Sequence, residues 1–341
     1  MDKGIVGLRN RGNTCYLNTA IQCLSNLKLL TEYFLSNNYI IDLNNRFNEL
    51  KDKKTNEIIL TKEYAKLIKA IWNSCSSIEP KTFHELIQHF DDRYDGYDQH
   101  DTQESLGLIL DHLHEGLLYN VEIKYSGNIE NKLDEIMVES IKQWKKVMKD
   151  KYSIIAELFF GQFINKVNSL EDHNKDKQLS KTFEMFSILT IPVYGRTLYD
   201  SFSKYFEKEI LESKYLDEKN NKSVNAYRQI KLMKVPKYLI IVLKKYKNNL
   251  SKLNNSISFP IEDLNLTQYC EGYDSIDCNL KLISIGCHKG ALNGGHYFAV
   301  CRNINGNWYK YDDDNVSEIN INDEKDNLFK DGYILIYEKN E

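Results

Sequence analysis

The stretch GLRNRGNTCYLNTAIQCL, residues 7–24, places a cysteine between a Gly-Asn-Thr turn and an apolar pattern of helical period. Apolar residues recur every three or four positions after Cys15, which predicts a helix with one buried stripe. Asn13 or Thr14 can cap it, so Cys15 falls in the first turn. The unpaired N–H groups and dipole of a helix N-terminus favour a thiolate. Cys15 is therefore a candidate nucleophile, although the position also suits a small buried apolar residue, the only interpretation left for Cys23.

The rest of the chain divides into a helical first part and a strand-rich second part. A second helix is predicted from Leu106 to Leu117, with Asp101 as its cap and Glu104 three residues later, similar to a capping box. Residues 119–153 are polar and partly helical around Trp144, and from residue 153 the apolar pattern becomes strand-like. Six later segments rich in β-branched and aromatic residues predict strands: 183–193, 237–246, 280–286, 296–302, 307–311 and 332–337. We therefore expect an α+β protein with a boundary near residue 153 and a mostly antiparallel sheet. The charged stretches 165–181 and 212–225 are expected to be solvated loops or strand connections.

Length and composition exclude several classes of protein. The 341 residues suffice for a large core, and 45 basic against 49 acidic residues do not favour nucleic acid as the partner. The seven cysteines form no CxxC pair, so neither a disulfide framework nor a zinc ribbon is predicted, and a reducing compartment is expected. No signal peptide is visible, and apolar runs such as LIIVL (239–243) are too short to span a bilayer. We expect a soluble protein of the cytoplasm or nucleus that binds no membrane.

A cysteine nucleophile needs a base from elsewhere in the chain. Among the eight histidines, His296 follows two glycines at the start of a predicted strand, in NGGHYFAV, where backbone can approach a ligand closely. In WYKYDDDNV a strand ends at three acidic residues that can reach back across a hairpin to this histidine. A carboxylate there would hold the imidazole in one tautomer and stabilise the imidazolium. Taken singly, the histidine could be structural and the acidic residues an ordinary solvated turn.

Six segments, in order along the chain, resemble the motifs of the ubiquitin-specific proteases. Residues 7–24 are similar to the family's cysteine box, and GGHYFAVCRN with WYKYDDDNV is similar to its histidine box. Between them, YDQHDTQESLGLILDHLHEGL, SIIAELFFGQF, KVPKYLIIVLKKY and ISFPIEDLNLTQY resemble four further family segments. The matches cover nearly the whole chain.

The resemblance implies a papain-like cysteine protease fold with a helical thumb, an antiparallel β palm and β fingers, as one catalytic domain over residues 1–341. The thumb and a helical insert would occupy about 1–152, and the fingers and palm about 153–341. By position, Cys15 is implied as nucleophile, His296 as general base and Asp312 as the third triad member. Asp313 matches a second acidic position that can also support the histidine. Asn10 matches the asparagine whose amide donates to the oxyanion, together with the backbone N–H of the nucleophile.

The resemblance also implies the substrate and the reaction. The thiolate would attack the carbonyl of ubiquitin's terminal glycine, His296 would protonate the leaving amine, and water would hydrolyse the thioester. Asp101 and Glu104 cap a helix by position, and in the family they also border the channel for ubiquitin's basic tail, so they are candidate substrate-binding residues. Gly295 and Tyr297, beside the histidine, complete the expected substrate-binding set. The expected partners are ubiquitin and ubiquitinated proteins, and a monomer without a cofactor or an accessory domain is expected.

Two departures from the family pattern bear on the site. Many members carry two CxxC pairs at the fingertips, whereas residues 165–180 and 214–229 contain no cysteine, so no structural zinc is expected. His100 and Ser105 stand where glutamine and phenylalanine are more usual, which bears on substrate preference and leaves the triad unchanged. Two alternatives remain open: an inactive ubiquitin-binding scaffold on the same fold, and a protease for a ubiquitin-like modifier.

Overall fold

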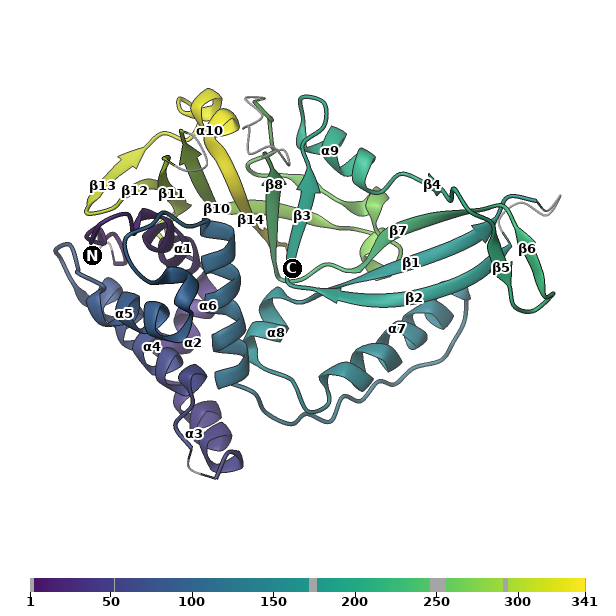
Figure 1. Ribbon diagram of the computed structural model, residues 1–341, viewed down its shortest axis with the longest axis horizontal. Coiled ribbons are helices and arrows are strands. Elements are labelled where there is room, and N and C mark those ends of the chain that lie inside the picture. Colours follow the sequence, from purple (N-terminus) through teal and green to yellow (C-terminus); the bar gives the residue numbers. More distant parts are fainter. Residues whose placement is uncertain (1–2, 52, 172–176, 246–255, 291–293, 341) are drawn as a thin grey trace.

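The computed structural model describes residues 3–51, 53–171, 177–245, 256–290 and 294–340. Helices gather at one end, a large sheet lies in the middle and a narrow sheet projects at the other end (Figure 1). The α-helices are α1 (Cys15–Ser25), α2 (Lys28–Leu35), α3 (Tyr39–Glu49), α4 (Asn56–Asn73), α5 (Lys81–Phe90), α6 (Thr102–Gly116), α7 (Lys132–Met148), α8 (Ile154–Phe159), α9 (Leu198–Tyr205) and α10 (Lys325–Asp331). Short 3₁₀ turns are η1 (Asp92–Tyr94), η2 (Thr267–Tyr269) and η3 (Tyr273–Ser275). The α+β class predicted from the sequence is confirmed.

The central sheet has the strand order β13-β12-β11-β10-β14-β8-β3, with β9 beside β10. Its strands are β3 (Ile188–Pro192), β8 (Tyr238–Lys244), β9 (Leu264–Asn265), β10 (Asn279–Lys289), β11 (His296–Arg302), β12 (Trp308–Asp312), β13 (Asn315–Ile319) and β14 (Gly332–Lys339). Every pair is antiparallel except β3 beside β8. The six predicted strand segments therefore all contain strand, and 183–193 includes the end of β2 and all of β3.

The two faces of the central sheet pack against different elements, because side chains alternate along a strand. On β8, Ile240 and Val242 join the core shared with the helices α1, α4 and α6. Leu239 and Ile241 belong to a second core on the opposite face, with α9, α10 and residues 257–270. Helix α1 lies directly on β11, which brings the predicted nucleophile segment beside the predicted histidine strand.

The projecting sheet has the strand order β2-β1-β7-β4, and a two-stranded hairpin lies at its far end. These strands are β1 (Gly161–Ser169), β2 (Gln178–Phe186), β4 (Glu209–Ile210), β5 (Tyr215–Asp217), β6 (Lys222–Val224) and β7 (Ala226–Lys234). Helix α7 runs along one side of this sheet (Figure 1). The sheet has little apolar burial along β2, where every residue is half-buried or exposed.

Two local predictions were wrong. Residues 161–169 and 178–186 form the paired strands β1 and β2, so both ends of the charged stretch 165–181 lie in strands, and residues 172–176 are outside the described part of the chain. The stretch 212–225 likewise contains β5 and β6. Residues 154–159 form helix α8 and not a strand, because the Ser153 side chain accepts from the N–H groups of Ile155 and Ala156 and starts a helix. The proposed boundary near residue 153 stays a prediction.

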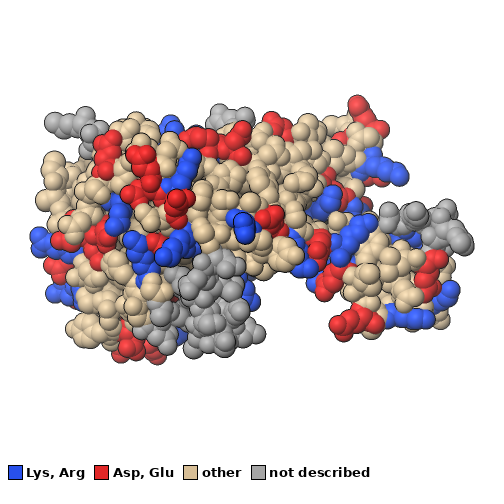
Figure 2. Space-filling view, turned by 90° about the horizontal axis from the view of Figure 1, so that it is seen from above, with Lys and Arg blue, Asp and Glu red and all other residues tan. Residues whose placement is uncertain are grey.

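Figure 2 shows Lys and Arg interspersed with Asp and Glu over one face of the molecule, as expected for a net charge of -4. No helix in the described part of the chain combines the length and the apolar character needed to cross a lipid bilayer.

Candidate active site

Cys15 is the first residue of α1 and is 2 % exposed. The chain turns sharply before it, because Gly12 and Asn13 both have positive φ angles, 95° and 55°. Thr14 occupies the cap position and makes no side-chain cap hydrogen bond. The first N–H groups of a helix have no partner within the helix. The N–H of Leu17 bonds to the carbonyl of Thr14 (3.1 Å), and no side chain caps α1, so the N–H groups of Cys15 and Tyr16 are available to an anion that forms beside the cysteine.

Asn10 builds the loop that precedes the cysteine. Its Oδ1 accepts hydrogen bonds from the backbone N–H groups of Gly12 (2.9 Å) and Thr14 (3.2 Å), and from the Thr14 hydroxyl (3.2 Å). Its Nδ2 donates to Asp313 at 2.9 Å. An amide nitrogen carries two hydrogens, so one remains for a substrate. The role of the Asn10 amide as a donor to the oxyanion stays a prediction. The side-chain oxygen of Asn10 has a structural role, because it accepts hydrogen bonds from the loop before Cys15.

His296, the predicted base for Cys15, is the first residue of β11. Nε2 of His296 lies 2.6 Å from Oδ1 of Asp312. The hydrogen bond with the Cys15 side chain and the neighbouring Asp312 carboxylate outweigh burial and raise the pKa of His296 to about 9. Since Nε2 is engaged by Asp312, Nδ1 is the ring nitrogen that serves Cys15. The structure therefore brings the three predicted triad residues together in the order cysteine, histidine, aspartate.

Asp312 has a second partner on its own strand. Its Oδ2 lies 2.7 Å from Nζ of Lys310. Burial acts to raise the pKa of Asp312, but Lys310 and His296 together hold it below its usual value. Asp312 therefore stays ionised beside the imidazole, which is the state that stabilises an imidazolium.

Asp313 holds the two catalytic segments together through contacts that we call the Asp313 clamp. Its Oδ1 accepts from Nδ2 of Asn18 (2.8 Å), its Oδ2 accepts from Asn10, and its backbone carbonyl accepts from the N–H of Leu8 (2.8 Å). A φ of 53° places Asp313 in the left-handed region at the β12–β13 turn. The carboxylate thus joins the loop before the nucleophile to the histidine hairpin.

A tight backbone contact reinforces this junction. A Cβ atom added to Gly7 would lie 2.4 Å from the carbonyl oxygen of Asp314, so any larger residue would push the turn away. The glycine is required here by close approach of two backbones.

The predicted substrate-binding acids have different surroundings. Asp101 caps α6 as predicted, accepting from the N–H of Gln103 (2.7 Å), and its other oxygen accepts from the Tyr333 hydroxyl (2.7 Å). Burial raises the pKa of Asp101 despite these two bonds. Glu104 is exposed and forms no capping box with Asp101. Substrate contact stays a prediction for both, and Glu104 has the more accessible carboxylate.

Gly295 and Tyr297 pack against the neighbouring strand. A Cβ atom on Gly295 would lie 1.9 Å from Nε2 of His288, so glycine is needed for packing at this position. Tyr297 is 3 % exposed, and its ring lies tilted by 37° against that of His288, with centroids 4.3 Å apart. Their substrate contact stays a prediction, and the small exposed surface of Tyr297 limits what it can offer.

Sequence reasoning missed two residues that orient the site, Asn18 and Lys310. Asn18 lies three positions after Cys15, on the same side of the helix, and is 2 % exposed. Lys310 lies two positions before Asp312, on the same face of a strand. Helical and strand periodicity applied outward from the triad would have identified both.

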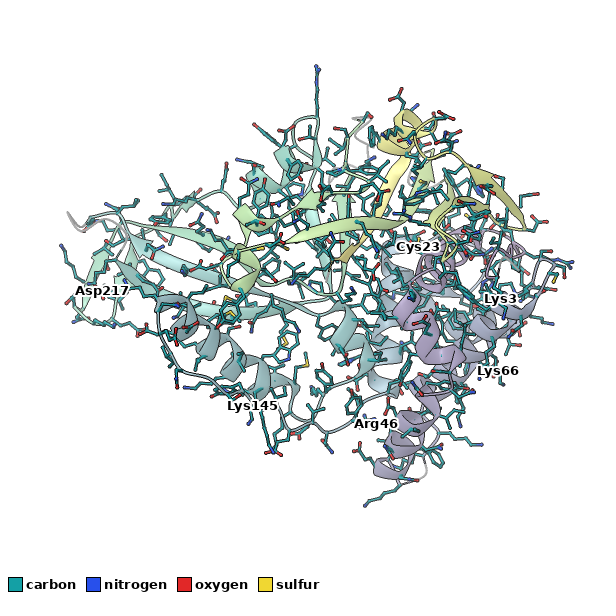
Figure 3. The ribbon with its side chains drawn as sticks, turned by 180° about the vertical axis from the view of Figure 1, so that it is seen from behind. Lys3, Cys23, Arg46, Lys66, Lys145 and Asp217 are labelled. Atoms are coloured by element: carbon teal, nitrogen blue, oxygen red, sulfur yellow. The ribbon has the colours of Figure 1, made fainter. Side chains whose placement is uncertain are left out.

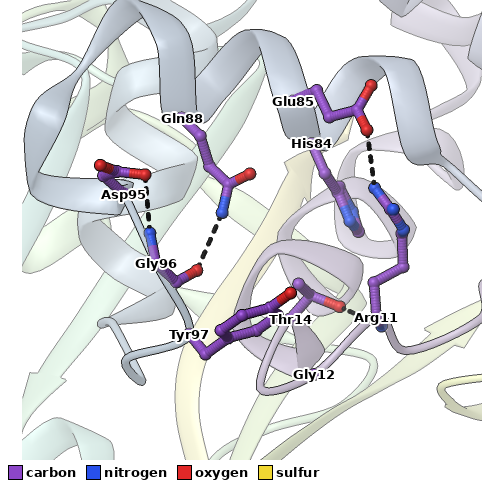
Figure 4. A pocket seen from close by; sticks show the side chains of 9 residues that line it. All are labelled: Arg11, Gly12, Thr14, His84, Glu85, Gln88, Asp95, Gly96 and Tyr97. Atoms are coloured by element: carbon purple, nitrogen blue, oxygen red, sulfur yellow. Dashed lines mark hydrogen bonds and ion pairs between the residues drawn. The ribbon is translucent and has the colours of Figure 1, made fainter.

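A cavity of about 270 Å³ adjoins the loop of residues 11–14 (Figure 4). Arg11 forms ion pairs there with Glu79 (3.1 Å) and Glu85 (3.4 Å). His84 lines the cavity, and both its ring nitrogens lack a hydrogen-bond partner among the described residues. Burial, aided by Arg11, lowers the pKa of His84 to about 3. His84 is therefore neutral at physiological pH and adds no charge beside the nucleophile loop.

One group of side chains in the described part of the chain has its ligand atoms close enough to share a metal ion: His296, Asp312 and Asp313, within 4.8 Å of one another. Each carboxylate is already committed, Asp312 to His296 and Lys310, and Asp313 to Asn10 and Asn18. The arrangement suits a hydrogen-bonded triad, with a nucleophilic sulfur, a base and an orienting acid.

The chain matches a family model, and relatives cover it nearly end to end. The model described as ubiquitin carboxyl-terminal hydrolase matches residues 6–337. Ubiquitin carboxyl-terminal hydrolase 2 of Homo sapiens is 30% identical over 354 residues, which cover 98% of this chain and 55% of that protein. Ubiquitin carboxyl-terminal hydrolase 5 of Saccharomyces cerevisiae is 28% identical over 372 residues, covering 98% of this chain and 45% of that protein. The chain thus spans about half the length of these relatives.

Solved structures share the fold. A chain of the SAGA DUB module bound to monoubiquitin superposes with a TM-score of 0.77 at 22% identity, covering 100% of this chain and 70% of that chain. The Ubp8/Sgf11/Sus1/Sgf73 DUB module bound to ubiquitin aldehyde gives a TM-score of 0.76 at 21% identity, with 100% and 70% covered. At these identities the likeness concerns the fold alone.

Proposed function

Because the chain belongs to the ubiquitin carboxyl-terminal hydrolase family, we propose that it is a deubiquitinating thiol protease that cleaves the peptide or isopeptide bond after ubiquitin's C-terminal glycine. The observation that carries the proposal is the alignment of Cys15, at the open N-terminus of α1, with His296 and Asp312. Ubiquitin and ubiquitinated proteins are the proposed partners.

The geometry supports a two-step reaction. The sulfur of Cys15 attacks the carbonyl carbon of the terminal glycine, and the negative charge that develops on the carbonyl oxygen is stabilised by the N–H groups at the start of α1 and by the free hydrogen of the Asn10 amide. His296 then donates its proton to the departing amine, and a thioester joins Cys15 to ubiquitin.

Hydrolysis of the thioester reverses these roles. His296, now neutral, takes a proton from a water molecule that attacks the thioester carbonyl, and the sulfur leaves as a thiolate that accepts a hydrogen bond from the imidazolium. Asp312 stabilises the charged ring in both steps, and Lys310 keeps Asp312 ionised. The Asp313 clamp keeps the Asn10 loop in register with the histidine hairpin throughout.

The test is turnover of a ubiquitin C-terminal fluorogenic amide by the wild-type protein and by Cys15→Ala. We expect Cys15→Ala to lose turnover, because no other group replaces the nucleophile. Cys75→Ala is the matched control, since Cys75 is exposed and far from the triad in sequence, and it should keep wild-type turnover.

Two outcomes would contradict the proposal. Absence of turnover in a folded wild-type protein that still binds ubiquitin would favour the inactive scaffold. Faster turnover of a ubiquitin-like modifier amide than of the ubiquitin amide would favour the other substrate.

A further inference from the structure

A second cavity lies far from the triad, beside helix α7. It has a volume of about 410 Å³ and lies between α7, the loop of residues 123–125, the end of β7 and the start of η3. Its walls are mainly apolar and aromatic, with Met137, Ile141 and Trp144 from α7, and Tyr125 and Tyr273 opposite. We call it the α7 pocket. Its volume falls within the range of small-molecule sites, which are mostly apolar with a few placed polar groups.

The charge in the α7 pocket is predominantly positive. Lys124, Lys234 and Lys339 line it, with Asp274 as the acidic residue among its lining side chains. Asp274 is fully engaged, because one oxygen pairs with Lys339 and the other accepts from the N–H of Val235 (2.8 Å). Lys124 pairs with Glu122 at 3.1 Å.

Lys234 differs from the other two lysines, because its ammonium lies on an aromatic ring. Nζ is 3.6 Å from the centroid of the Trp144 ring. Burial, with the nearby charge of Lys339, lowers the pKa of Lys234 to about 8. A ring face compensates an ammonium only in part, and a desolvated charge favours an anionic partner. The pocket thus combines an apolar wall with a cation that no carboxylate in the pocket contacts directly.

We propose that the α7 pocket binds a small hydrophobic carboxylate, whose carboxylate contacts the Lys234 ammonium while its apolar body packs on Trp144, Met137 and Ile141. Charge complementarity determines the headgroup, because Lys339 is paired with Asp274 and Lys124 with Glu122, whereas Lys234 lies on the Trp144 ring and forms no ion pair with the carboxylate that lines the pocket. The apolar wall determines the rest of the ligand. The site is separate from the proposed hydrolase site, since no triad residue lines it.

The test compares 4-phenylbutyrate with its neutral isostere 4-phenylbutyramide, by isothermal titration calorimetry and by tryptophan fluorescence. Trp144 lines the pocket, whereas Trp72 and Trp308 do not, so binding should change the emission of Trp144. We expect the acid to bind about tenfold or more tightly than the amide, because a hydrogen bond to a charged group adds that much.

Substitutions of Lys234 test whether its ammonium is the group that binds the carboxylate. Lys234→Met keeps the length of the side chain and removes its charge, so the acid should then bind no better than the amide. Lys234→Arg should retain the preference. Lys231→Met is the matched control, because it removes an equal charge from the same strand outside the pocket and should leave both affinities unchanged.

Three results would overturn the proposal: no saturable binding of the acid at millimolar concentration, equal affinity for acid and amide in the wild-type protein, or an acid preference that survives Lys234→Met. The comparison of acid with amide needs no variant, so the proposal can be tested even if a substitution destabilises the fold.

Discussion

Two regions of the molecule join distant chain segments in opposite ways. One is the active site, and the other is the far end of the projecting sheet, with β5, β6, Glu171 and Lys177, which we call the fingertip. The active site joins residues 7–18 to 296–314 over a buried core, with Cys15 and Asn18 each 2 % exposed. The fingertip joins the β1–β2 hairpin to the β5–β6 hairpin by polar contacts at an exposed end. Asp217 there and Cys23 on α1 lie in opposite halves of the molecule (Figure 3).

The fingertip contacts lie in residues 165–180 and 214–229, the two segments that contain no cysteine. Asp217 accepts from Nζ of Lys177 (2.7 Å) and from Nδ2 of Asn220 (2.7 Å). Glu171 accepts from both the backbone and the side-chain nitrogen of Asn225, each at 3.0 Å. No large core lies beneath these contacts, since β5 and β6 each bury a single residue.

The difference between the two regions predicts which property a substitution changes in each. At the active site, hydrogen bonds position reacting groups on a rigid support, so removing one changes the rate by orders of magnitude. At the fingertip, exposed ion pairs contribute little to global stability, so removing one should change local order alone. Four predictions test this contrast.

The largest effect is expected from Asn10→Ala, which should lower kcat by about 10²- to 10³-fold through loss of one oxyanion donor. The measurement is steady-state turnover of the ubiquitin amide. Arg9→Ala is the matched control, because Arg9 lies next to Asn10 and its side chain donates to the hydroxyl of Ser77, away from the triad residues. It should change kcat little.

A double variant separates the oxyanion role from the structural role of Asn10. Asn10→Asp keeps the acceptor for Gly12 and Thr14 but places a carboxylate against Asp313. Combining it with Asp313→Asn restores a donor and an acceptor in exchanged positions. We expect the double variant to recover the Tm and not kcat. Recovery of kcat as well would mean that Asn10 only positions the loop.

An intermediate effect is expected from the charge of His296. Its pKa is raised from 6.5 to about 9 in the folded protein, chiefly by the Cys15 side chain and also by Asp312. Stabilisation by the protonated ring is therefore complete below about pH 6.5 and is lost as the pH rises through about 9. Because the side chain is 43 % exposed, solvent screening limits the contribution to on the order of 1 kcal/mol.

Denaturant unfolding of the wild type and of His296→Gln from about pH 6 to pH 10 measures this contribution. The difference in unfolding free energy between the two proteins should decrease with rising pH. A difference that increases with pH would show that the ring is not held in its protonated form by Cys15 and Asp312.

The smallest effect is expected at the fingertip. Asp217→Asn weakens the contact with Lys177, so amide hydrogen exchange should become faster within residues 215–224 while kcat stays unchanged. Glu218→Gln, which removes a neighbouring exposed charge, is the control and should leave exchange as it is.

A further prediction concerns metal binding at the fingertip. We expect a chelator to leave exchange at the fingertip unchanged, because the segments at the tip lack cysteine. About one mole of tightly bound zinc per mole of protein would contradict this expectation.

Much of the helical part and of the central sheet could be predicted from the sequence, because their patterns are strongly periodic. Leu106, Ile109 and Leu113 recur at helical spacing and are 0% exposed on α6. The charged parts of β1 and β2, residues 165–169 and 178–181, were expected to be loops or strand connections, because both faces of the projecting sheet are partly exposed and these strands lack apolar alternation. Helix α8 differs from the expected strand because a run of six residues, five of them apolar, does not distinguish a strand from a buried helix.

The triad was predicted from residue types and their order, whereas its hydrogen bonds were not. The sequence indicated Asp313 as a second acidic support for the histidine. In the structure its carboxylate accepts from Asn10 and Asn18, because the β12–β13 turn lies against the loop before α1, and its support of His296 stays a prediction. The Tyr333 hydroxyl on Asp101 was equally invisible, since 232 residues separate the two.

By itself, then, the sequence determined the candidate nucleophile, its base and its orienting acid, because local patterns decide which residue begins a helix or a strand. Only the tertiary structure decided which partner each polar group takes, and that Lys234 lies on Trp144 in a cavity with a paired aspartate. The physical reason is the separation along the chain over which each interaction acts. Periodicity and capping act over a few residues, whereas a hydrogen bond forms between whichever groups the packed core brings within about 3 Å.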